Sequence, residues 1–195
     1  VQVQGGLLSL TGTDLEVEMI SRIAVEDAQD GETTIPARKL FEIVRALPDG
    51  SKVTVSQTGD KVTVSAGRSR FTLATLPAND FPSVDEVEAT ERVNVPEAAL
   101  KELIERTAFA MAQQDVRYYL NGLLFDLDDR LLRCVATDGH RLALAETEAP
   151  KGSATLKGVI APRKCVAEAR RLLDGAPEKV VVEASDSKIV FRIGE

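Results

Sequence analysis

The chain has 195 residues and a formal net charge of −7, and 44% of its residues are hydrophobic, which suits one large or two small globular domains. It has no apolar run of about 18 residues, so no membrane-spanning helix is expected. It also has no charged and then apolar leader, so no secretion signal is expected. The negative net charge argues against non-specific nucleic-acid binding by the whole surface. A local basic face is still compatible with this net charge. Cys134 and Cys165 lie far apart among apolar residues, so we expect reduced, buried thiols, no metal site and a cytoplasmic protein.

Residues 1–75 predict several strands around a single helix. From Ala37 the apolar residues recur with the period of a helix: four of them, from Leu40 to Leu47, form one stripe. Pro48 is expected to end this helix. Apolar runs and alternation predict strands at 1–3, 7–11, 15–24 and 33–36, a hairpin of 52–57 with 61–66, and a strand at 70–75.

The strand at 70–75 places Phe71 and Leu73 on one face. It is either an edge strand with that face in the core or an edge that pairs with another chain, because an apolar strand edge invites pairing.

The segment 76–91, with two prolines and a cluster of acids, is predicted as an extended connector, so we place one domain at 1–91 and a second at 92–195. Pro96 is expected at the first position of a helix that runs to about Ala112, with Glu97 in its first turn. The rest of the chain predicts strands at 123–128, 131–137, 141–148 and 158–162, a helix from Arg163, and a final hairpin within 179–193.

A tight turn with a lone histidine lies between two of these strands. Asp138 and Gly139 are a strong turn signal, and His140 is the only histidine of the chain. A hydrolase would need a nucleophile activated by such a base, and the sequence has neither a G-x-S-x-G motif nor a cysteine-protease context. We therefore expect no catalytic residue here; the simplest alternative is a surface turn whose histidine takes part in a hydrogen bond.

The segment 113–121 is the other unusual stretch. It contains both tyrosines of the chain, Tyr118 and Tyr119, next to Arg117. Either the tyrosines are half-buried anchors of a loop, or the segment is a polar, basic and aromatic loop that contacts phosphates or bases.

Several of these patterns occur twice, about 125 residues apart. Thr13-Asp14 follows an apolar strand as Thr137-Asp138 does, and 35–40 resembles 160–165. Each copy continues with a helix, an Asp-Gly exit and a hairpin. A period of this length predicts a domain duplication rather than a solenoid, whose repeats are about 20 to 50 residues long.

Four segments together, Thr137–Ala143, Gln114–Gly122, Pro36–Lys39 and Ala66–Phe71, closely resemble the β sliding clamp family of bacterial DNA polymerase III. The resemblance covers nearly the whole chain. It implies an α+β clamp fold of duplicated domains, each with two helices packed on antiparallel sheets. Comparison of the two copies adds that a helix precedes the matching strands in the second copy but not in the first, so we expect the natural chain to start about 30 to 40 residues earlier, judged from ordinary element sizes. The second copy also lacks the last strand of the first, 70–75, so we expect a fragment truncated at both ends.

The resemblance also implies two functional surfaces, one for DNA and one for short peptides. The first meets duplex DNA together with the helices that face the pore, and it comprises Gln114, Arg117, Tyr118, Tyr119, Lys164 and Arg38. The second is a pocket for short hydrophobic linear motifs of DNA polymerases, the clamp loader and mismatch-repair proteins, and it comprises Leu120, Thr137, Gly139, His140, Arg141 and Leu142.

A third implied surface is the edge of the first domain that closes a dimeric ring. Its residues are Lys39, Ile43, Arg68, Arg70, Phe71 and Leu73. The leading hypothesis is therefore a DNA polymerase processivity factor, an accessory protein without catalysis or cofactor. The alternatives are a protein-interaction module that never contacts DNA and, far less favoured, a hydrolase that uses Asp138 and His140.

Overall fold

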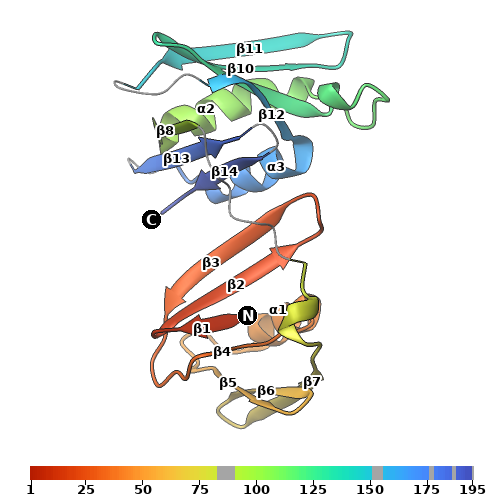
Figure 1. The fold of residues 1–195 in the computed structure, drawn as a ribbon, viewed down its shortest axis with the longest axis vertical. Coiled ribbons are helices and arrows are strands. Elements are labelled where there is room, and N and C mark those ends of the chain that lie inside the picture. The colour runs from red at the N-terminus through yellow and green to blue at the C-terminus, as the bar shows by residue number, and fades with distance from the viewer. Residues whose placement is uncertain (83–90, 151–155, 176–177, 186–187, 195) are drawn as a thin grey trace. The chain divides into compact units, whose positions relative to one another are not determined.

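The computed structural model describes residues 1–82, 91–150, 156–175, 178–185 and 188–194 (Figure 1). The chain separates into two units, Val1–Val84 and Asp85–Glu195. Of the connector predicted for 76–91, residues 83–90 lie outside the described residues, and Ala78–Asp80 form a short 3-10 helix where an extended chain was expected. The division at 91/92 stays a prediction. Among the described residues, no helix is both long and apolar enough to cross a membrane.

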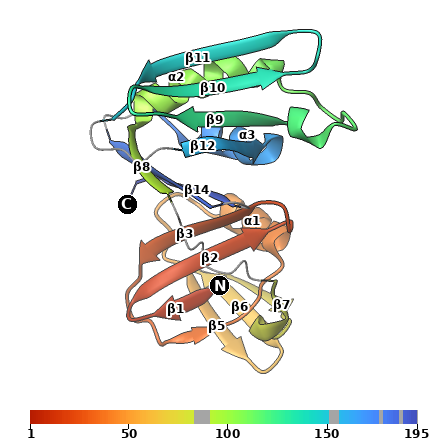
Figure 2. The same ribbon diagram turned by 45° about the horizontal axis from the view of Figure 1, so that its top comes forward.

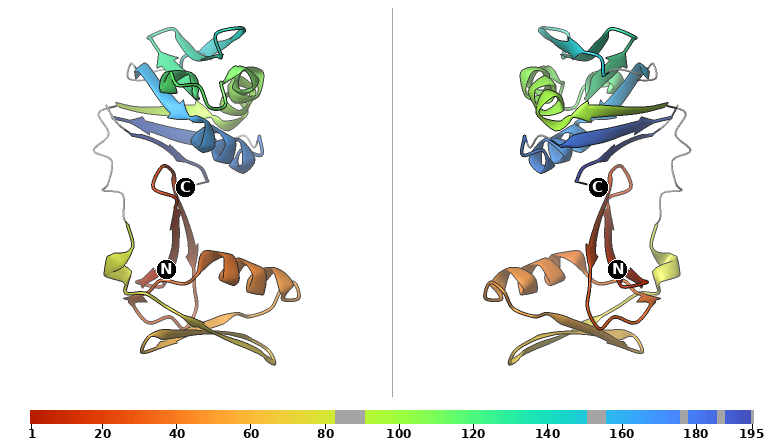
Figure 3. Two further views of the ribbon diagram at one scale, coloured as in Figure 1. Left: turned by 90° about the vertical axis from the view of Figure 1, so that its right-hand side faces the viewer. Right: turned by 90° about the vertical axis from the view of Figure 1, so that its left-hand side faces the viewer.

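The first unit contains two antiparallel sheets and the helix α1 (Ala37–Ala46). Figure 3 shows α1 lying over the second of these sheets. The strands of the first sheet, in the order β3-β2-β1-β4, are β1 (Gln2–Gln4), β2 (Leu7–Thr13), β3 (Glu18–Ala24) and β4 (Gly31–Glu32). Those of the second, in the order β5-β6-β7, are β5 (Thr54–Thr58), β6 (Lys61–Ala66) and β7 (Ser69–Ala74).

The second unit contains two antiparallel sheets and the helices α2 (Glu97–Thr107) and α3 (Arg163–Leu172). The strands of the larger sheet, in the order β11-β10-β9-β12, are β9 (Gly122–Leu127), β10 (Leu131–Thr137), β11 (Leu142–Glu148) and β12 (Leu156–Pro162). Those of the smaller sheet, in the order β14-β13-β8, are β8 (Glu91–Pro96), β13 (Lys179–Ala184) and β14 (Ile189–Arg192).

The core of the second unit joins both helices to both sheets. α2 packs against β10 and β11, α3 packs against β9 and β12, and the two helices contact each other. Figure 2 shows the four strands of the larger sheet side by side with α2 behind them. Leu100, Ile104 and Phe125 are among the fully buried side chains at this junction. This packing holds the loops at one end of the sheet in fixed positions.

The predicted duplication is confirmed by topology and by hydrogen bonds. The sheet β3-β2-β1-β4 matches β11-β10-β9-β12 strand for strand, each with a helix after its last strand in the chain. In both copies a threonine hydroxyl donates to the carbonyl four residues on, from Thr13 to Val17 and from Thr137 to Arg141. The next aspartate accepts from the two backbone N–H groups two and three residues ahead, at Asp14 and at Asp138.

Two predicted boundaries were wrong, one because of a contact with a distant segment and one because of the local geometry at Thr107. The strand expected at 33–36 is absent: the ladder reaches only Thr33, which exchanges hydrogen bonds with Val1, and the Thr34 hydroxyl bonds to Leu76 instead. α2 ends at Thr107, not near Ala112, since Thr107 leaves the helical region at φ −124° and its hydroxyl donates to the Leu103 carbonyl at 2.6 Å.

The start of α2 also differs from the prediction. Pro96 is the last residue of β8, a strand that the sequence did not predict, and it lies opposite Lys179 with an extended ψ of 131°. It therefore stands just before the helix, and Glu97 is the first helical residue.

Candidate functional site

The turn between β10 and β11 is closed by its own side chains. The Thr137 hydroxyl accepts from Gly139 N–H at 3.1 Å and donates to the Arg141 carbonyl at 2.7 Å. Asp138 Oδ1 accepts from the N–H groups of His140 and Arg141 at 2.9 and 3.0 Å, and Oδ2 accepts from Arg141 Nε at 3.0 Å. These backbone donors lower the pKa of Asp138. The carboxylate is thus occupied by groups other than the imidazole, which argues against an Asp–His catalytic pair.

The loop 113–121 has a second internal network. The Asn121 side chain bridges the main chain of Asp115, accepting from its N–H and donating to its carbonyl, both at 2.9 Å. Asp115 in turn accepts from the Arg117 side chain through Nε at 2.9 Å and Nη2 at 2.8 Å. The guanidinium lowers the pKa of Asp115 to about 2. The loop is therefore ordered by local polar contacts.

The loop and the turn lie next to each other. The Arg117 guanidinium covers Gly139, where an added methyl group would stand 3.1 Å from Arg117 Nη2. The charge of His140 contributes to the lowered pKa of Asp115. At the other end of the loop, Arg163 N–H donates to the Asn121 carbonyl at 3.0 Å, which ties the start of α3 to the same site.

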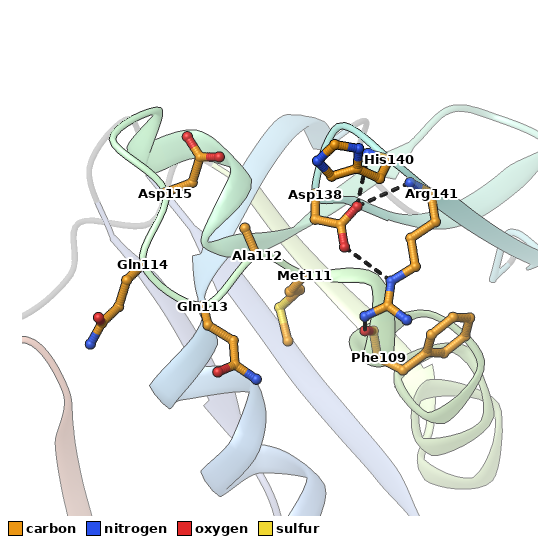
Figure 4. Close-up of a pocket in the computed structure, with 9 residues that line it drawn as sticks. All are labelled: Phe109, Met111, Ala112, Gln113, Gln114, Asp115, Asp138, His140 and Arg141. Atoms are coloured by element: carbon orange, nitrogen blue, oxygen red, sulfur yellow. Dashed lines mark hydrogen bonds and ion pairs between the residues drawn. The ribbon is translucent and has the colours of Figure 1, made fainter.

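Arg141 fastens the turn to the end of α2. Its Nη2 donates to the Phe109 carbonyl at 2.9 Å, and its guanidinium carbon lies 5.6 Å from the centre of the Phe109 ring, a cation–π distance. Figure 4 shows these contacts at the edge of a pocket of about 410 Å³. Its lining residues are Phe109, Met111, Ala112, Gln113, Gln114, Asp115, Asp138, His140 and Arg141.

Of the six residues predicted for linear-motif binding, five lie at this turn and two of these, His140 and Arg141, line the pocket. Thr137 lies opposite Leu142 in the β10–β11 ladder, and Leu142 is 65% exposed. The strand leaves its leucines outside because Ala143 and Ala145, which face inward, lie against α2. The sixth residue, Leu120, is buried and its carbonyl accepts from Ala112 N–H. An exposed leucine beside a polar turn offers a contact to an apolar side chain of another protein.

The predicted DNA-contact residues are divided between the two units. Tyr118 and Tyr119 are 83% and 51% exposed, with rings edge to face at 5.9 Å, so Tyr118 is not a half-buried anchor of the loop, whereas Tyr119 is half-buried. Lys164 is exposed in the first turn of α3, and Arg38 lies in the other unit on α1, paired with Glu42 at 3.2 Å. Gln114 is exposed in the same loop as the tyrosines.

Two family models match this chain: the DNA polymerase III beta subunit, central domain, over residues 94–195, and the N-terminal domain of the same subunit over residues 1–85. The chain belongs to the DNA polymerase III beta subunit family. The beta sliding clamp of Escherichia coli K12 is 49% identical over 100% of this chain and 53% of its own length, and that of Pseudomonas putida KT2440 is 53% identical over 99% and 53%.

Solved sliding clamps share the fold. The Pseudomonas aeruginosa DNA polymerase III subunit beta superposes with a TM-score of 0.94 at 48% identity, over 100% of this chain and 53% of that one. A structure of the same species' clamp bound to griselimycin gives a TM-score of 0.93. The α+β clamp fold is thereby confirmed, and the chain spans about half the length of the clamps that it matches.

The predicted ring-closing residues of this clamp chain lie on α1 and on β7, an edge strand. Phe71 is 39% exposed, Leu73 and Ile43 are half-buried, and Lys39 pairs with Glu42 at 3.1 Å. The remaining two, Arg68 and Arg70, are exposed at the β6–β7 turn and on β7.

The described residues give little support to a metal site or to a reactive thiol. The described residues contain no group of three or more His, Cys, Asp or Glu side chains arranged for a metal ion. Cys134 is buried and Cys165 half-buried, both as free thiols, and burial raises the pKa of Cys134 to about 12 and that of Cys165 to about 11. Such thiols are poor nucleophiles at neutral pH.

The sequence analysis missed the residues that hold the site together. Asp115, Asn121 and Phe109 were not singled out, although they fix Arg117 and Arg141. The Asp-x-Arg spacing of 115–117 is a sequence signal for a local turn. No sequence signal indicates the approach of Phe109 to Arg141, because it depends on where α2 ends.

Proposed function

We propose that this chain forms the first two domains of a processivity clamp, divided near residues 91 and 92, which surrounds duplex DNA as a ring and tethers its partner proteins. The observation that carries the proposal is the close contact, in a member of the beta subunit family, between an exposed tyrosine-and-arginine loop and a polar turn flanked by an exposed leucine. One surface suits DNA, and the other suits a short apolar motif.

The charge distribution supports contact with a polyanion despite the net charge of −7. α3 has four basic residues and one acidic, and α1 has three basic and one acidic. The ion pairs of these helices are exposed, such as Arg171 with Glu168 at 3.1 Å and Lys39 with Glu42. Exposed pairs are worth about 0 to 1 kcal/mol, so phosphates could compete for these cations. α2, with three acids and two bases, does not share this bias.

The DNA contact is tested by neutralising single cations in the full-length protein. Arg117→Gln and Lys164→Gln are each expected to weaken association with a labelled DNA duplex and to reduce the slope of log affinity against log salt by about 0.9, with little sequence preference. The matched control is Arg130→Gln, which removes the same charge at the exposed β9–β10 turn. Equal affinities for all four proteins would contradict the DNA-binding proposal.

The linear-motif pocket is tested by placing a charge on its exposed leucine. Leu142→Lys is expected to weaken binding of a labelled peptide bearing the clamp-binding motif of the same organism's DNA polymerase by roughly tenfold or more, as loss of an anchor contact does. Leu144→Lys is the matched control, since Leu144 is 54% exposed two residues along the same strand but outside the proposed pocket. If both variants bind equally, measured by fluorescence polarisation, the pocket lies elsewhere.

The family resemblance suggests which proteins bind to this chain. We propose that the polymerase, the clamp loader and mismatch-repair proteins use the Leu142 pocket, and that α1 and β7 close a homodimeric ring. The edge position of β7 and its partly exposed Phe71 support this ring contact.

The alternative function is a protein-interaction module that does not bind DNA. One observation favours it: the guanidinium of Arg117 is paired with Asp115 in a loop that has no other charged side chain. The salt-dependent binding of the charge variants separates the two functions.

A further inference from the structure

The charge of the loop 113–121 is internally neutralised. Its sequence contains one cation, Arg117, and one anion, Asp115. Two side-chain hydrogen bonds of 2.9 and 2.8 Å join them. The Asp115 side chain is 22% exposed and that of Arg117 50%, so the carboxylate lies deeper than the cation that it holds. A phosphate that approaches the loop therefore meets an arginine already bound to an anion.

The carboxylate is not the only group that sets the path of the loop. Asn121 holds the main chain of Asp115 through its N–H and carbonyl, and Arg163 N–H holds the carbonyl of Asn121. Neither contact uses the Asp115 side chain. Of the bonds that Asp115 Oδ1 and Oδ2 accept, one comes from the backbone N–H of Arg117 and the others from its guanidinium. The hydrogen-bond donors to this carboxylate all belong to Arg117.

The guanidinium is held in one direction, over Gly139. In this position it lies against the turn between β10 and β11. The sister pair differs: Asp138 binds Arg141, whose Nη2 is also bonded to the Phe109 carbonyl. Arg141 is fixed at a second point, whereas the side-chain hydrogen bonds of Arg117 within the described part of the chain go to Asp115 alone.

We propose that Asp115 is a built-in competitor of the DNA phosphate for Arg117, which keeps the loop's affinity for DNA low. The inference rests on the proposed DNA contact of this loop. An exposed ion pair is weak enough for a phosphate to replace it. The carboxylate thus keeps the binding of the loop to DNA reversible, which suits a protein that must slide along DNA without being held at one place.

The test is a double-mutant cycle in the full-length protein, read by the anisotropy of a short fluorescein-labelled DNA duplex of mixed sequence at several salt concentrations. Asp115→Asn keeps an oxygen that can accept from Arg117 N–H while removing the charge. It is expected to tighten binding about two- to fivefold, the range that one exposed ion pair supplies, and to leave the salt slope unchanged, because Arg117 neutralises one phosphate in both proteins. In an Arg117→Gln background the same change is expected to have no effect on the affinity.

The matched control is Asp138→Asn, which makes the same substitution in the sister pair and is expected to leave the affinity for DNA unchanged because Arg141 stays bonded to Phe109. Unaltered far-UV circular dichroism shows that the variants are folded. If Asp115→Asn binds no tighter while Arg117→Gln binds more weakly, this inference is overturned and the proposed DNA function stands. A gain that persists without Arg117, or appears equally in Asp138→Asn, also overturns it. If the wild-type protein shows no salt-dependent association, both fail.

Discussion

Replacing Gly122 with alanine is expected to destabilise the second unit by about 3 kcal/mol, the upper end of ordinary overpacking costs. An ideal Cβ at this position would lie 2.5 Å from Cγ2 of Ile160 and 2.6 Å from the carbonyl oxygen of Ala161. Gly122 begins β9 and lies opposite Pro162 in the β9–β12 ladder. The side chain of Ile160 could rotate, but the carbonyl belongs to the backbone, so the two strands must separate.

The effect of Gly122→Ala should reach the functional site, since Asn121 precedes Gly122 and binds both Asp115 and Arg163. The chain has two tyrosines and no tryptophan, and both tyrosines lie in the second unit, so tyrosine fluorescence follows the unfolding of that unit. We expect the urea midpoint of that transition to fall markedly.

The control for this steric argument is Gly12→Ala. Gly12 also lies in a strand, β2, but an added Cβ there would meet no atom within 4 Å. Its urea curve, followed by far-UV circular dichroism, should match that of the wild type. A Gly122→Ala protein whose midpoint equals that of the wild type would show that β9 and β12 tolerate the added methyl group and that the close approach is not rigid.

The sequence predicted the elements whose periodicity is local. α1 begins at Ala37 and β10 spans Leu131–Thr137, as expected, because an apolar stripe and a buried run between turn residues identify them without knowledge of the fold. It failed where distant segments decide. β8 exists because it pairs with β13, far along the chain.

The candidate site shows the same division. Asp138 and Gly139 correctly predicted a tight turn, and Gly139 adopts φ +88°. Yet Leu15 adopts φ +75° in the duplicate turn, which has the same hydrogen bonds. A positive φ alone therefore does not demand glycine here. The further reason in the second unit is the Arg117 guanidinium that lies against Gly139, a contact between two loops that no local pattern reveals.

Replacing Glu97 with alanine is the second large effect that we expect, a loss of about 2 to 3 kcal/mol in the stability of the second unit, as for hydrogen bonds to a buried charge. Glu97 is 3% exposed at the start of α2. Its Oε1 accepts from the N–H groups of Asp174 and Gly175 at 2.7 and 2.9 Å, just beyond the end of α3. The carboxylate thus joins the two helices, and the amino-terminal end of α2 favours its negative charge.

Two further substitutions separate this link from a general effect of charge on α2. Glu97→Gln keeps an oxygen that can accept both hydrogen bonds but removes the charge, so an intermediate loss of about 1 kcal/mol is expected. Glu102→Ala removes an exposed carboxylate that pairs with Arg106 at 2.7 Å on the same helix, and it should cost no more than about 0.5 kcal/mol. Urea unfolding followed by tyrosine fluorescence ranks the three variants. If Glu97→Ala is no less stable than Glu102→Ala, the buried carboxylate does not hold α2 to the end of α3, and the packing of the apolar core must position the helices alone.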